Sequence, residues 1–336
     1  MEAAAAAFGA AAAPPGGWPA TFLIVAWRMR ETLPAALAGA LAQTVPCEII
    51  VSDDASGDGG IAALAPLLAG YAGPHRVRLR QGERNLGLCA HLHELVAMAS
   101  APIVFNSAGD DVSKPQRVAA ILAEFAAHPQ AMIVGSSVDD VDAEGRLLQA
   151  ATRGLPRRVD QDWLLAQGKL ATILGASMAW RRALFDGFPP LQGRVEDNML
   201  MLRGALLGEC RCLPQPLIDY RRHDNNLGDW VFDRSESGYA GWKRRQLRVA
   251  EMYLQIADDQ RRCLQARGDL DAERRAKGGH LQALYRLEAE QRIALVERPR
   301  RDWIDPLWRG LRLRGLRRKS AERALKLLLP RRLFGR

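Results

Sequence analysis

The chain of 336 residues contains no long uncharged apolar run. No stretch approaches the roughly 18 apolar residues that a membrane-spanning helix needs, which argues against a spanning protein. Residues 1–20, rich in Ala, Pro and Gly, also lack the positively charged start of a secretion signal. We therefore expect residues 1–20 to be a disordered tail and the protein to be cytoplasmic.

Cysteine is scarce and its spacing is uninformative for metal or redox chemistry. The chain has five cysteines, an odd number, and they are scattered. Cys210 and Cys212 form a C-x-C pair, whereas zinc sites and redox sites favour C-x-x-C. We interpret the cysteines as reduced thiols of the core.

Acidic residues are nearly absent from one end of the chain. Residues 306–336 contain eleven basic residues and one acid, a net charge of +10, so the remainder sums to about −1. The body is therefore not a nucleic-acid-binding surface. In the segment 306–336, Leu and Trp alternate with Arg, which favours an amphipathic helix in contact with an anionic membrane surface. A solvated basic helix that packs on the body or on a partner is the alternative.

Hydrophobic periodicity organises the first half of the chain. Buried strands are predicted at 21–26, 47–52, 76–80 and 101–107, and helical patterns lie between them. Strands that alternate with helices indicate βαβ units and a doubly wound, mostly parallel α/β sheet of the Rossmann-like kind. In such sheets ligands bind beyond the carboxyl ends of the strands.

The pattern of apolar and charged residues changes at two places in the second half of the chain. From about Ala131 the pattern is mixed, with a strand, a hairpin-like turn and a helix that begins at Glu196. Beyond Trp230 nearly everything reads as charged helix. We therefore predict one α/β domain over 21–229 and a helical, basic C-terminal region over 230–336.

Two acidic pairs follow predicted strands. Asp53 and Asp54 end one strand, and Asp110 and Asp111 follow another. Adjacent carboxylates at a strand end are costly unless they meet a cation or hydrogen-bond donors. Taken alone, the first pair fits either a nucleotide-binding site or an Asx-type turn. The second fits either a divalent-cation site or solvated acids at a helix N-terminus.

Six motifs occur in a fixed order along the chain: T-F-L-I-V-A-W, V-S-D-D-A-S-G-D, N-L-G, A-G-D-D-V-S-K-P, E-D-N-M-L-M-L-R and Y-R-R-H-D-N-N. In this order and spacing they resemble the family 2 inverting glycosyltransferases, whose fold is called GT-A. The resemblance covers roughly 21–228.

The resemblance implies roles for residues of the first two strand ends. Asp53 and Asp54 match acids that bind the nucleotide, and Asn85 of N-L-G belongs to the same cofactor-binding group. Trp27 stands in V-A-W-R, where many members carry P-T-Y-N, so its ring is expected either to stack on the base or to pack.

Metal and catalytic roles fall on later motifs. The resemblance places the principal metal ligand, for Mg²⁺ or Mn²⁺, at Asp110, with Asp111 as its supporting neighbour in donor binding. His223 matches a histidine near the metal and diphosphate, and Asp197 matches the general base. Ala108 stands where many members have an acid, which weakens the expected ribose or metal contact.

The function implied is inverting, metal-dependent transfer from a nucleoside diphosphate sugar to a hydroxyl of a glycan or lipid-linked glycan. Assembly of a surface polysaccharide such as capsule, exopolysaccharide or lipopolysaccharide is the expected setting. A rival hypothesis is an inactive glycosyltransferase-like scaffold at the membrane, supported by Ala108 and V-A-W-R. A second rival, a sugar-1-phosphate nucleotidyltransferase, would need a Gly-rich loop after the first strand, and W-R-M-R-E-T-L-P is not one.

Overall fold

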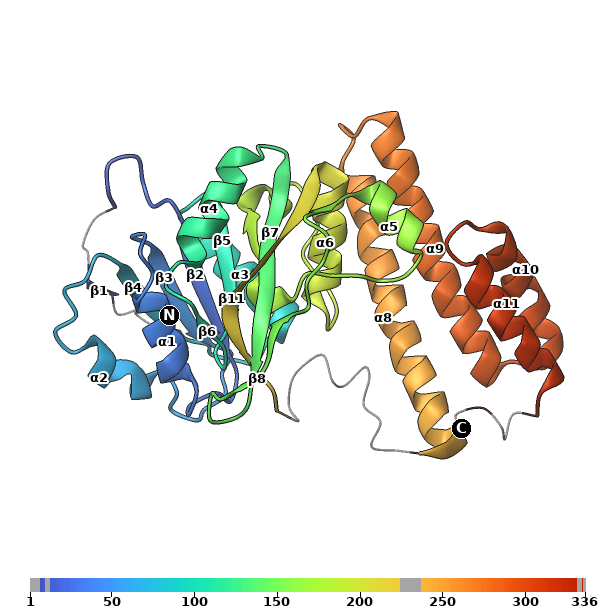
Figure 1. Cartoon of the computed structure of the whole chain (residues 1–336), viewed down its shortest axis with the longest axis horizontal. Coiled ribbons are helices and arrows are strands. Elements are labelled where there is room, and N and C mark those ends of the chain that lie inside the picture. Colours follow the sequence, from blue (N-terminus) through green and yellow to red (C-terminus); the bar gives the residue numbers. More distant parts are fainter. Residues whose placement is uncertain (1–6, 10–12, 224–236, 331–333, 335–336) are drawn as a thin grey trace. The chain divides into compact units, whose positions relative to one another are not determined.

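The computed structural model describes residues 7–9, 13–223, 237–330 and 334. The chain forms two compact units, one from Met1–Val159 and Thr172–His223, the other from Asp160–Ala171 and Asp224–Arg336. Figure 1 labels their helices and strands.

The first unit is built on one sheet flanked by helices. Its strands are β1 (Ala7–Gly9), β2 (Thr21–Ala26), β3 (Glu48–Asp53), β4 (Arg76–Gln81), β5 (Ile103–Ala108), β6 (Val112–Ser113), β7 (Ala131–Val141), β8 (Leu147–Thr152), β9 (Arg158–Val159), β10 (Ala179–Arg181) and β11 (Glu209–Arg221). Its helices are α1 (Leu33–Leu41), α2 (Ala65–Leu68), α3 (Leu88–Met98), α4 (Arg117–Ala127) and α6 (Glu196–Leu207), with short turns η1 (Ala62–Leu64), η2 (Gly175–Ser177) and η3 (Arg182–Leu184).

The strand order is β1-β4-β3-β2-β5-β10-β7-β11-β6, with β8 paired to β7 and β9 to β11. Strands β4, β3, β2 and β5 run parallel, as do β7 and β11, and β10 lies antiparallel between the two sets. This arrangement confirms the predicted α/β class, a mostly parallel GT-A type sheet.

Helices cover both faces of this sheet, which explains why its central strands read as continuous apolar runs. Alternate residues of β2 and β3, such as Phe22 and Ile49, share a core with α1 and α4. The intervening residues face α3, since Ser52 Oγ lies 2.8 Å from His91 Nε2. A sheet buried on both faces leaves the strand ends as the place where polar side chains reach the surface.

The N-terminal tail differs from the disorder predicted for residues 1–20. Residues 7–9 form strand β1, which pairs antiparallel with β4 at the edge of the sheet. Trp18 is buried directly before β2. An unpaired edge strand exposes donors and acceptors, so a short Ala-rich segment gains hydrogen bonds by pairing there, which composition alone does not reveal.

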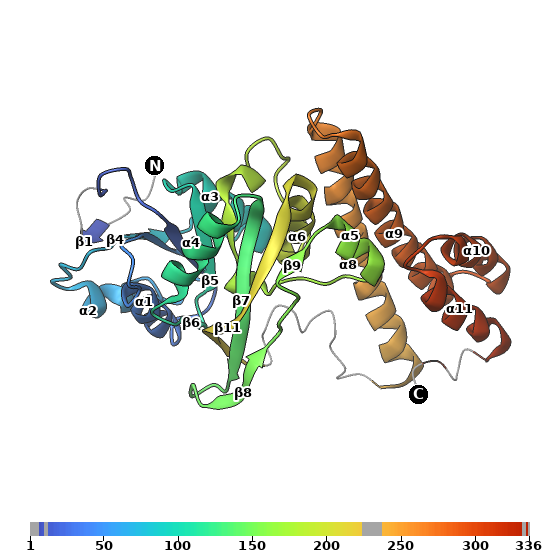
Figure 2. The ribbon, with the colours of Figure 1, turned by 45° about the horizontal axis from the view of Figure 1, so that its top comes forward.

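The second unit is helical, as predicted for the C-terminal extension. It contains α5 (Gln161–Gln167), α8 (Gly238–Ala266), α9 (Ala272–Glu297), η4 (Arg300–Trp303), α10 (Ile304–Arg312), α11 (Arg317–Leu325) and η5 (Lys326–Leu328). Figures 1 and 2 both show α8 and α9 side by side. None of the helices in the described ranges is long and apolar enough to cross a membrane.

Residues 160–171 join the helical unit although strands β10 and β11 of the sheet follow them in sequence. The reason is polar docking of α5 on α9. Gln161 Nε2 donates to the carbonyl of Arg274 at 3.1 Å, and Lys277 Nζ lies 2.7 Å from Asp162 Oδ2. The five cysteines are distributed over both units and all are buried thiols, as predicted.

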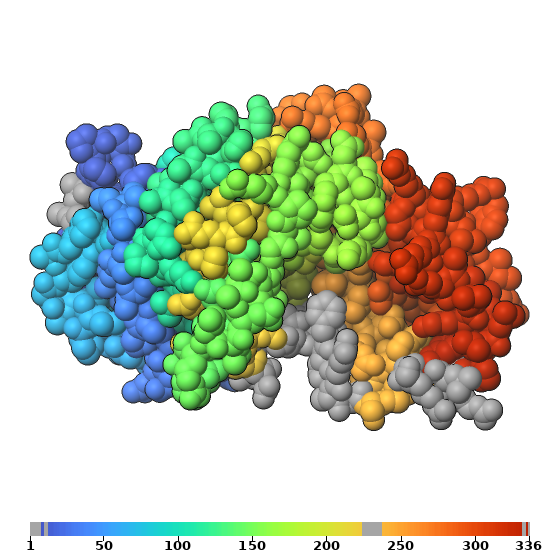
Figure 3. Space-filling model, viewed as in Figure 1, coloured from blue at the N-terminus to red at the C-terminus, as the bar shows by residue number. Residues whose placement is uncertain are grey.

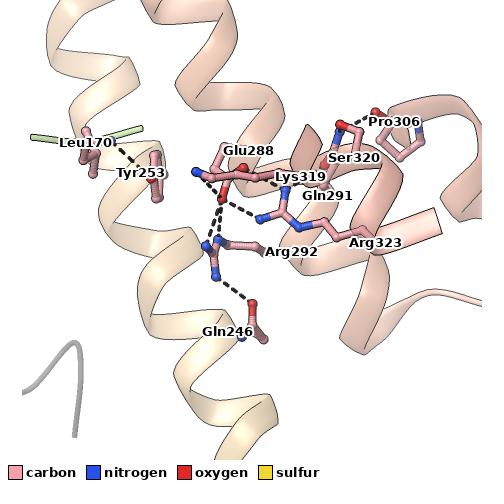
Figure 4. Close-up of polar contacts among 10 residues, drawn as sticks. All are labelled: Leu170, Gln246, Tyr253, Glu288, Gln291, Arg292, Pro306, Lys319, Ser320 and Arg323. Atoms are coloured by element: carbon pink, nitrogen blue, oxygen red, sulfur yellow. Dashed lines mark hydrogen bonds and ion pairs between the residues drawn. The ribbon is translucent and has the colours of Figure 1, made fainter. Parts of the chain in front are cut away.

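A buried carboxylate fixes the C-terminal helices to α9. Glu288 is fully buried, and its oxygens accept hydrogen bonds from Arg323 at 2.6 and 2.7 Å and from Arg292 at 3.0 Å (Figure 4). Gln291 Nε2 donates at 2.8 Å both to the Pro306 carbonyl and to Ser320 Oγ. One turn of α9 therefore holds α10 and α11 together.

Candidate functional site

Three adjacent strands of the first unit end at one edge of the sheet. The Asp54 amide donates to the Ala26 carbonyl at 2.9 Å, and the Gly109 amide donates to the Val25 carbonyl at 2.9 Å. The segments that leave β3 and β5 are thus both tied to the end of β2. Trp27, the first acidic pair and the second acidic pair consequently share this edge, which we call the strand-end edge.

Asp53 is the last residue of β3, one position later than the predicted strand end. Its carboxylate accepts from the Ser56 amide at 2.8 Å, from Ser56 Oγ at 2.5 Å and from Gln81 Nε2 at 2.6 Å. The side chain is nearly buried. It shapes the loop after β3, in agreement with the Asx-type turn that the sequence also allowed, and nucleotide contact remains a prediction.

Asp54 supports the turn before α3. Its carboxylate accepts from the amides of Leu86 and Gly87 at 2.9 and 2.8 Å. Asn85 is exposed, and its side-chain amide donates to the Asp54 carbonyl at 3.3 Å. The helix cap itself is Gly87, with φ of 77°, a conformation that glycine adopts without strain. The structure therefore brings Asp54 and Asn85 together, and their contact with a nucleotide remains a prediction.

Trp27 projects from the end of β2 with its ring exposed, and the guanidinium of Arg28 stacks 4.5 Å from the ring centroid. Arg28 has φ of 57°, an uncommon value for a non-glycine residue that turns the chain sharply away from β2. Of the two interpretations left open by the sequence, packing in the core does not hold. The ring is accessible for stacking on a base.

Asp110 and His223 meet although 113 positions separate them. His223 Nε2 lies 2.9 Å from Asp110 Oδ2. No group of three or more His, Cys, Asp or Glu side chains placed to share a metal occurs in the described ranges, and Ala108 adds no carboxylate. A carboxylate and an imidazole fit a Mg²⁺ or Mn²⁺ site that diphosphate oxygens and water complete, since Mg²⁺ is commonly held through few protein ligands.

Asp111 lies beneath Asp110 and is fully buried. Its Oδ1 accepts from the Arg221 amide at 2.9 Å, and its Oδ2 has no hydrogen-bond partner among the described residues. Burial and the adjacent charge of Asp110 raise the pKa of Asp111 well above its usual range. Asp111 thus supports the loop from inside, and its predicted contact with a bound donor stays a prediction.

Arg117 is a buried cation that the sequence did not single out. Its guanidinium donates to Ser113 Oγ at 2.9 Å and to the carbonyls of Asn106 and Ala176 at 2.7 and 2.9 Å. Burial lowers the pKa of Arg117 to about 9, and the charge of Asp111 opposes that shift. Arg117 therefore fixes the segment that carries the second acidic pair.

Arg221, which the sequence left out of the predicted site, is half-buried and bound to the second acidic pair. Its Nε donates to the Asp110 carbonyl at 3.1 Å, and one terminal nitrogen donates to the carbonyls of Asp142 and Ala143, the first at 3.1 Å. One guanidinium thereby ties the Asp110 loop to the turn after β7. Because Arg221 precedes His223 by two residues, it also positions the chain that brings His223 to Asp110.

Glu196 and Asp197 begin helix α6. The Asn198 amide and side chain donate to Asp197 Oδ1 at 2.7 and 3.0 Å. Glu196 packs on Gly175, where an added Cβ would lie 2.3 Å from Glu196 Oε1. Gly175 is in turn bound to β5, since Asn106 Nδ2 donates to its carbonyl at 3.1 Å. The acidic start of α6 is therefore anchored to the strand that leads to the second acidic pair.

The two carboxyls at the start of α6 have raised pKa values. Burial raises the pKa of Asp197 to about 6, although hydrogen bonds from Asn198 act in the opposite direction. Burial and the neighbouring Asp197 raise the pKa of Glu196 to about 8. The two carboxyls titrate as a pair, and Asp197 is the more acidic of the two. A carboxylate with a pKa near the working pH suits general-base catalysis.

The sequence predicted Asp197 for the base and assigned Glu196 no role. Gly175, Asn106, Arg117 and Arg221 were missed, because their contacts join segments far apart in the chain. Only Arg221 carried a usable signal, its place in Y-R-R-H.

Comparison with known proteins identifies this sheet unit. The protein-family model described as Glycosyl transferase family 2 matches residues 21–188 of the sequence. An uncharacterized protein of Mycobacterium tuberculosis (strain H37Rv) is 26% identical over 207 residues, which cover 60% of this chain and 58% of that protein. The putative glycosyltransferase EpsE of Bacillus subtilis (strain 168) is 29% identical over 161 residues, 46% of this chain and 55% of EpsE. The chain thus matches less than two thirds of the length of these relatives.

Solved structures give the same fold. The Staphylococcus aureus TarS fragment 1–349, crystallised with UDP-GlcNAc, superposes with a TM-score of 0.53 at 14% identity and covers 92% of this chain and 90% of that chain. At this identity the likeness shows the fold alone.

Proposed function

Because the chain belongs to the family 2 glycosyltransferases, we propose that it transfers a sugar from a nucleoside diphosphate sugar to a hydroxyl of a glycan or lipid-linked glycan, with inversion. The observation that carries this proposal is geometric: Asp197 begins a helix that is anchored, through Gly175 and Asn106, to the strand that leads to Asp110. Burial raises the pKa of Asp197 to about 6, which suits a base. A base and a cation ligand are the two groups that such a reaction needs.

In the proposed reaction Asp197 accepts the proton of the acceptor hydroxyl as its oxygen attacks the anomeric carbon. The bond from that carbon to the diphosphate breaks on the opposite side, which inverts the configuration. A divalent cation held by Asp110 and His223 would offset the negative charge that gathers on the leaving diphosphate. Trp27 and the loops shaped by Asp53 and Asp54 would receive the base and ribose.

Surface polysaccharide assembly in the cytoplasm, at the membrane, is the setting that we propose for this activity. The rival hypothesis of an inactive scaffold draws on Ala108, which leaves the cation with fewer protein ligands. The raised pKa of Asp197 favours the enzyme, because burying a carboxylate with few partners has a cost that a scaffold has no reason to retain.

A thermal-shift panel tests the proposal. UDP, GDP, CDP and dTDP are each added with and without Mn²⁺ to the wild type, to Asp110→Ala and to Asp186→Ala, a matched removal of an exposed acid. At a hundredfold excess over Kd the matching nucleotide should add about 2.7 kcal/mol of stability. We expect this with Mn²⁺ in the wild type and Asp186→Ala, and its loss in Asp110→Ala.

Two results would contradict the proposal. If no nucleotide stabilises the wild type, the transferase assignment fails and the scaffold gains support. If stabilisation is equal without metal, the role of Asp110 fails.

A further inference from the structure

Helix α10 has an apolar face that nothing in the described ranges covers. Ile304, Trp308 and Leu311 are 62%, 50% and 41% exposed. Their spacing of four and three residues places them on one side of a helix. Leu307 and Gly310, on another side, are buried against the unit. An exposed stripe of large apolar side chains on a helix whose core face is already packed points to an external partner.

A second exposed apolar cluster lies beside the start of this helix. Leu325, Leu328 and Leu329 are exposed at the end of α11 and in η5. Arg300 Nη1 donates to the Leu327 carbonyl at 2.7 Å, and its other terminal nitrogen donates to the Leu329 carbonyl. Since Arg300 precedes Ile304 by four residues, it ties this cluster to the beginning of α10.

The charge around these side chains is strongly positive. Residues 300–330 include ten basic residues and three acids, a net charge of +7. Arg314 and Arg317, in the turn and start of α11, are exposed and form no ion pair with any acid in the described part of the chain. Arg312 stacks on Trp308, with 3.3 Å between its guanidinium carbon and the ring centroid. The apolar stripe is therefore bordered by cations.

This surface is held rigidly from behind. The contacts of Glu288 and Gln291 with α10 and α11 lie on the inner side of the two helices (Figure 4). Gly310 allows that approach, because a Cβ there would lie 2.1 Å from both Gln291 Nε2 and Ser320 Oγ. In Figure 3 the red C-terminal helices form an outer surface of the second unit. The exposed side chains are thus presented by a fixed support.

We propose that this face, formed by the stripe of α10 (Ile304, Trp308, Leu311) and the cluster Leu325, Leu328 and Leu329, binds the surface of an anionic lipid bilayer. Apolar side chains enter the boundary between headgroups and acyl chains, and the flanking arginines meet anionic headgroups. Tryptophan suits that depth, with an apolar ring and a polar N–H.

The positive charge that borders this apolar face indicates which kind of partner binds it. A second copy would bring the same exposed cations, Arg312, Arg314 and Arg317, to this surface, so like charges oppose self-association. A polyanion without an apolar part would use the arginines and leave Ile304, Leu311 and Leu328 in water. A bilayer with anionic headgroups accommodates both features, and this proposal does not depend on the transferase activity.

Co-sedimentation of the full-length protein with vesicles tests the proposal. Vesicles of phosphatidylcholine alone are compared with vesicles that also contain phosphatidylglycerol. We expect binding to the anionic vesicles that weakens in high salt. The double variant Ile304→Glu/Trp308→Glu should lower partitioning on the order of tenfold or more, and Arg314→Glu/Arg317→Glu, which replaces two cations by two anions, by about thirtyfold or more.

The matched control is Leu147→Glu, at a residue of strand β8 that is 62% exposed, as Ile304 is. It should bind vesicles like the wild type. Equal binding to neutral vesicles, or unchanged binding of Ile304→Glu/Trp308→Glu with an intact circular dichroism spectrum, would overturn the proposal. Sedimentation velocity without lipid tests whether the face binds a second copy instead. If the wild type self-associates, Ile304→Glu/Trp308→Glu abolishes this and neither binds vesicles, the face is a contact between copies of this chain.

Discussion

Both units bury carboxyl groups, and their environments drive the protonation in opposite directions. In the helical unit burial would raise the pKa of Glu288, but hydrogen bonds and charge from Arg323, together with Arg292, lower it to about 2. In the sheet unit burial raises the pKa of Asp197 to about 6 and that of Glu196 to about 8. The difference is the supply of cationic donors.

The comparison separates a structural acid from a candidate catalytic one. Glu288 is ionised and paired with Arg292 of its own helix and with Arg323 of α11, so its charge stabilises the packing of α11 on α9. Asp197 receives hydrogen bonds only from Asn198 among the contacts described for its carboxylate, and within the described residues no arginine charge is among the causes that set its pKa. A carboxyl kept in a costly environment, on a helix anchored to the strand that leads to a predicted metal ligand, is a candidate for proton transfer.

The largest effect is expected from Asp197→Asn, which keeps the side-chain shape and removes the base. Hydrolysis of the donor identified by the nucleotide panel, with water as acceptor, should slow by about 10² to 10⁴ in kcat. Nucleotide-dependent thermal stabilisation should persist, because donor binding does not use this carboxylate. Unchanged turnover would remove Asp197 from the mechanism and leave its raised pKa a feature of packing.

On the structural side, Glu288→Gln leaves Arg323 and Arg292 without their shared buried anion. Removal of one partner of a buried ion pair costs about 3 to 5 kcal/mol, so urea unfolding should show a loss near the lower value. Glu290→Gln, which removes a partly exposed partner of Arg286 and Arg309, is the control and should cost less than about 1 kcal/mol. Equal losses would show that burial of Glu288 adds nothing.

A smaller effect is expected from Arg221→Ala, because this residue acts through the Asp110 loop. The Kd for nucleotide with Mn²⁺ should rise about tenfold, close to the value of one charge-assisted contact. Arg222→Ala is the neighbouring control, with no expected change. Partial recovery in Arg221→Lys would support a positioning role, whereas equal nucleotide affinity in Arg221→Ala would show that the Asp110 loop is held without it.

The pH dependence of stability should have opposite signs in the two units. The folded pKa of Asp197, about 6, lies above its ordinary value of 3.8, so its contribution is present at low pH and is lost as pH rises through 6. The folded pKa of Glu288, about 2, lies below 4.5, so its contribution is present above 4.5 and is lost as pH falls towards 2. At pH 8, Asp197→Asn should therefore be more stable than the wild type by on the order of 1 kcal/mol, and Glu288→Gln less stable.

Urea unfolding at pH 8 and pH 4 measures this contrast. The gain from Asp197→Asn should vanish at pH 4, where Asp197 is protonated in the folded protein. A gain of the same size at both pH values would mean that Asn198 or packing, and not the charge, controls the effect.

Much of the sheet was predictable, because local periodicity marks buried strands and the acids at their ends. Asp53, Asp54 and Asp110 fell at the strand-end edge for that reason. The pairing of β1 and the grouping of α5 with α9 were not predictable, since each depends on partners far away in sequence. The burial of Asp111 and Arg117 could not be predicted either, because charged residues are usually exposed and the sequence does not show which of them are buried.

The pH dependence of donor hydrolysis tests the central claim, that an ionised Asp197 acts as the base. Between pH 5 and pH 8 the kcat of the wild type should rise with an apparent pKa near 6 and then level off, and Asp197→Asn should lose this rise together with most of its activity. A profile that stays flat across this range in the wild type, or a rise that persists in Asp197→Asn, would contradict the account.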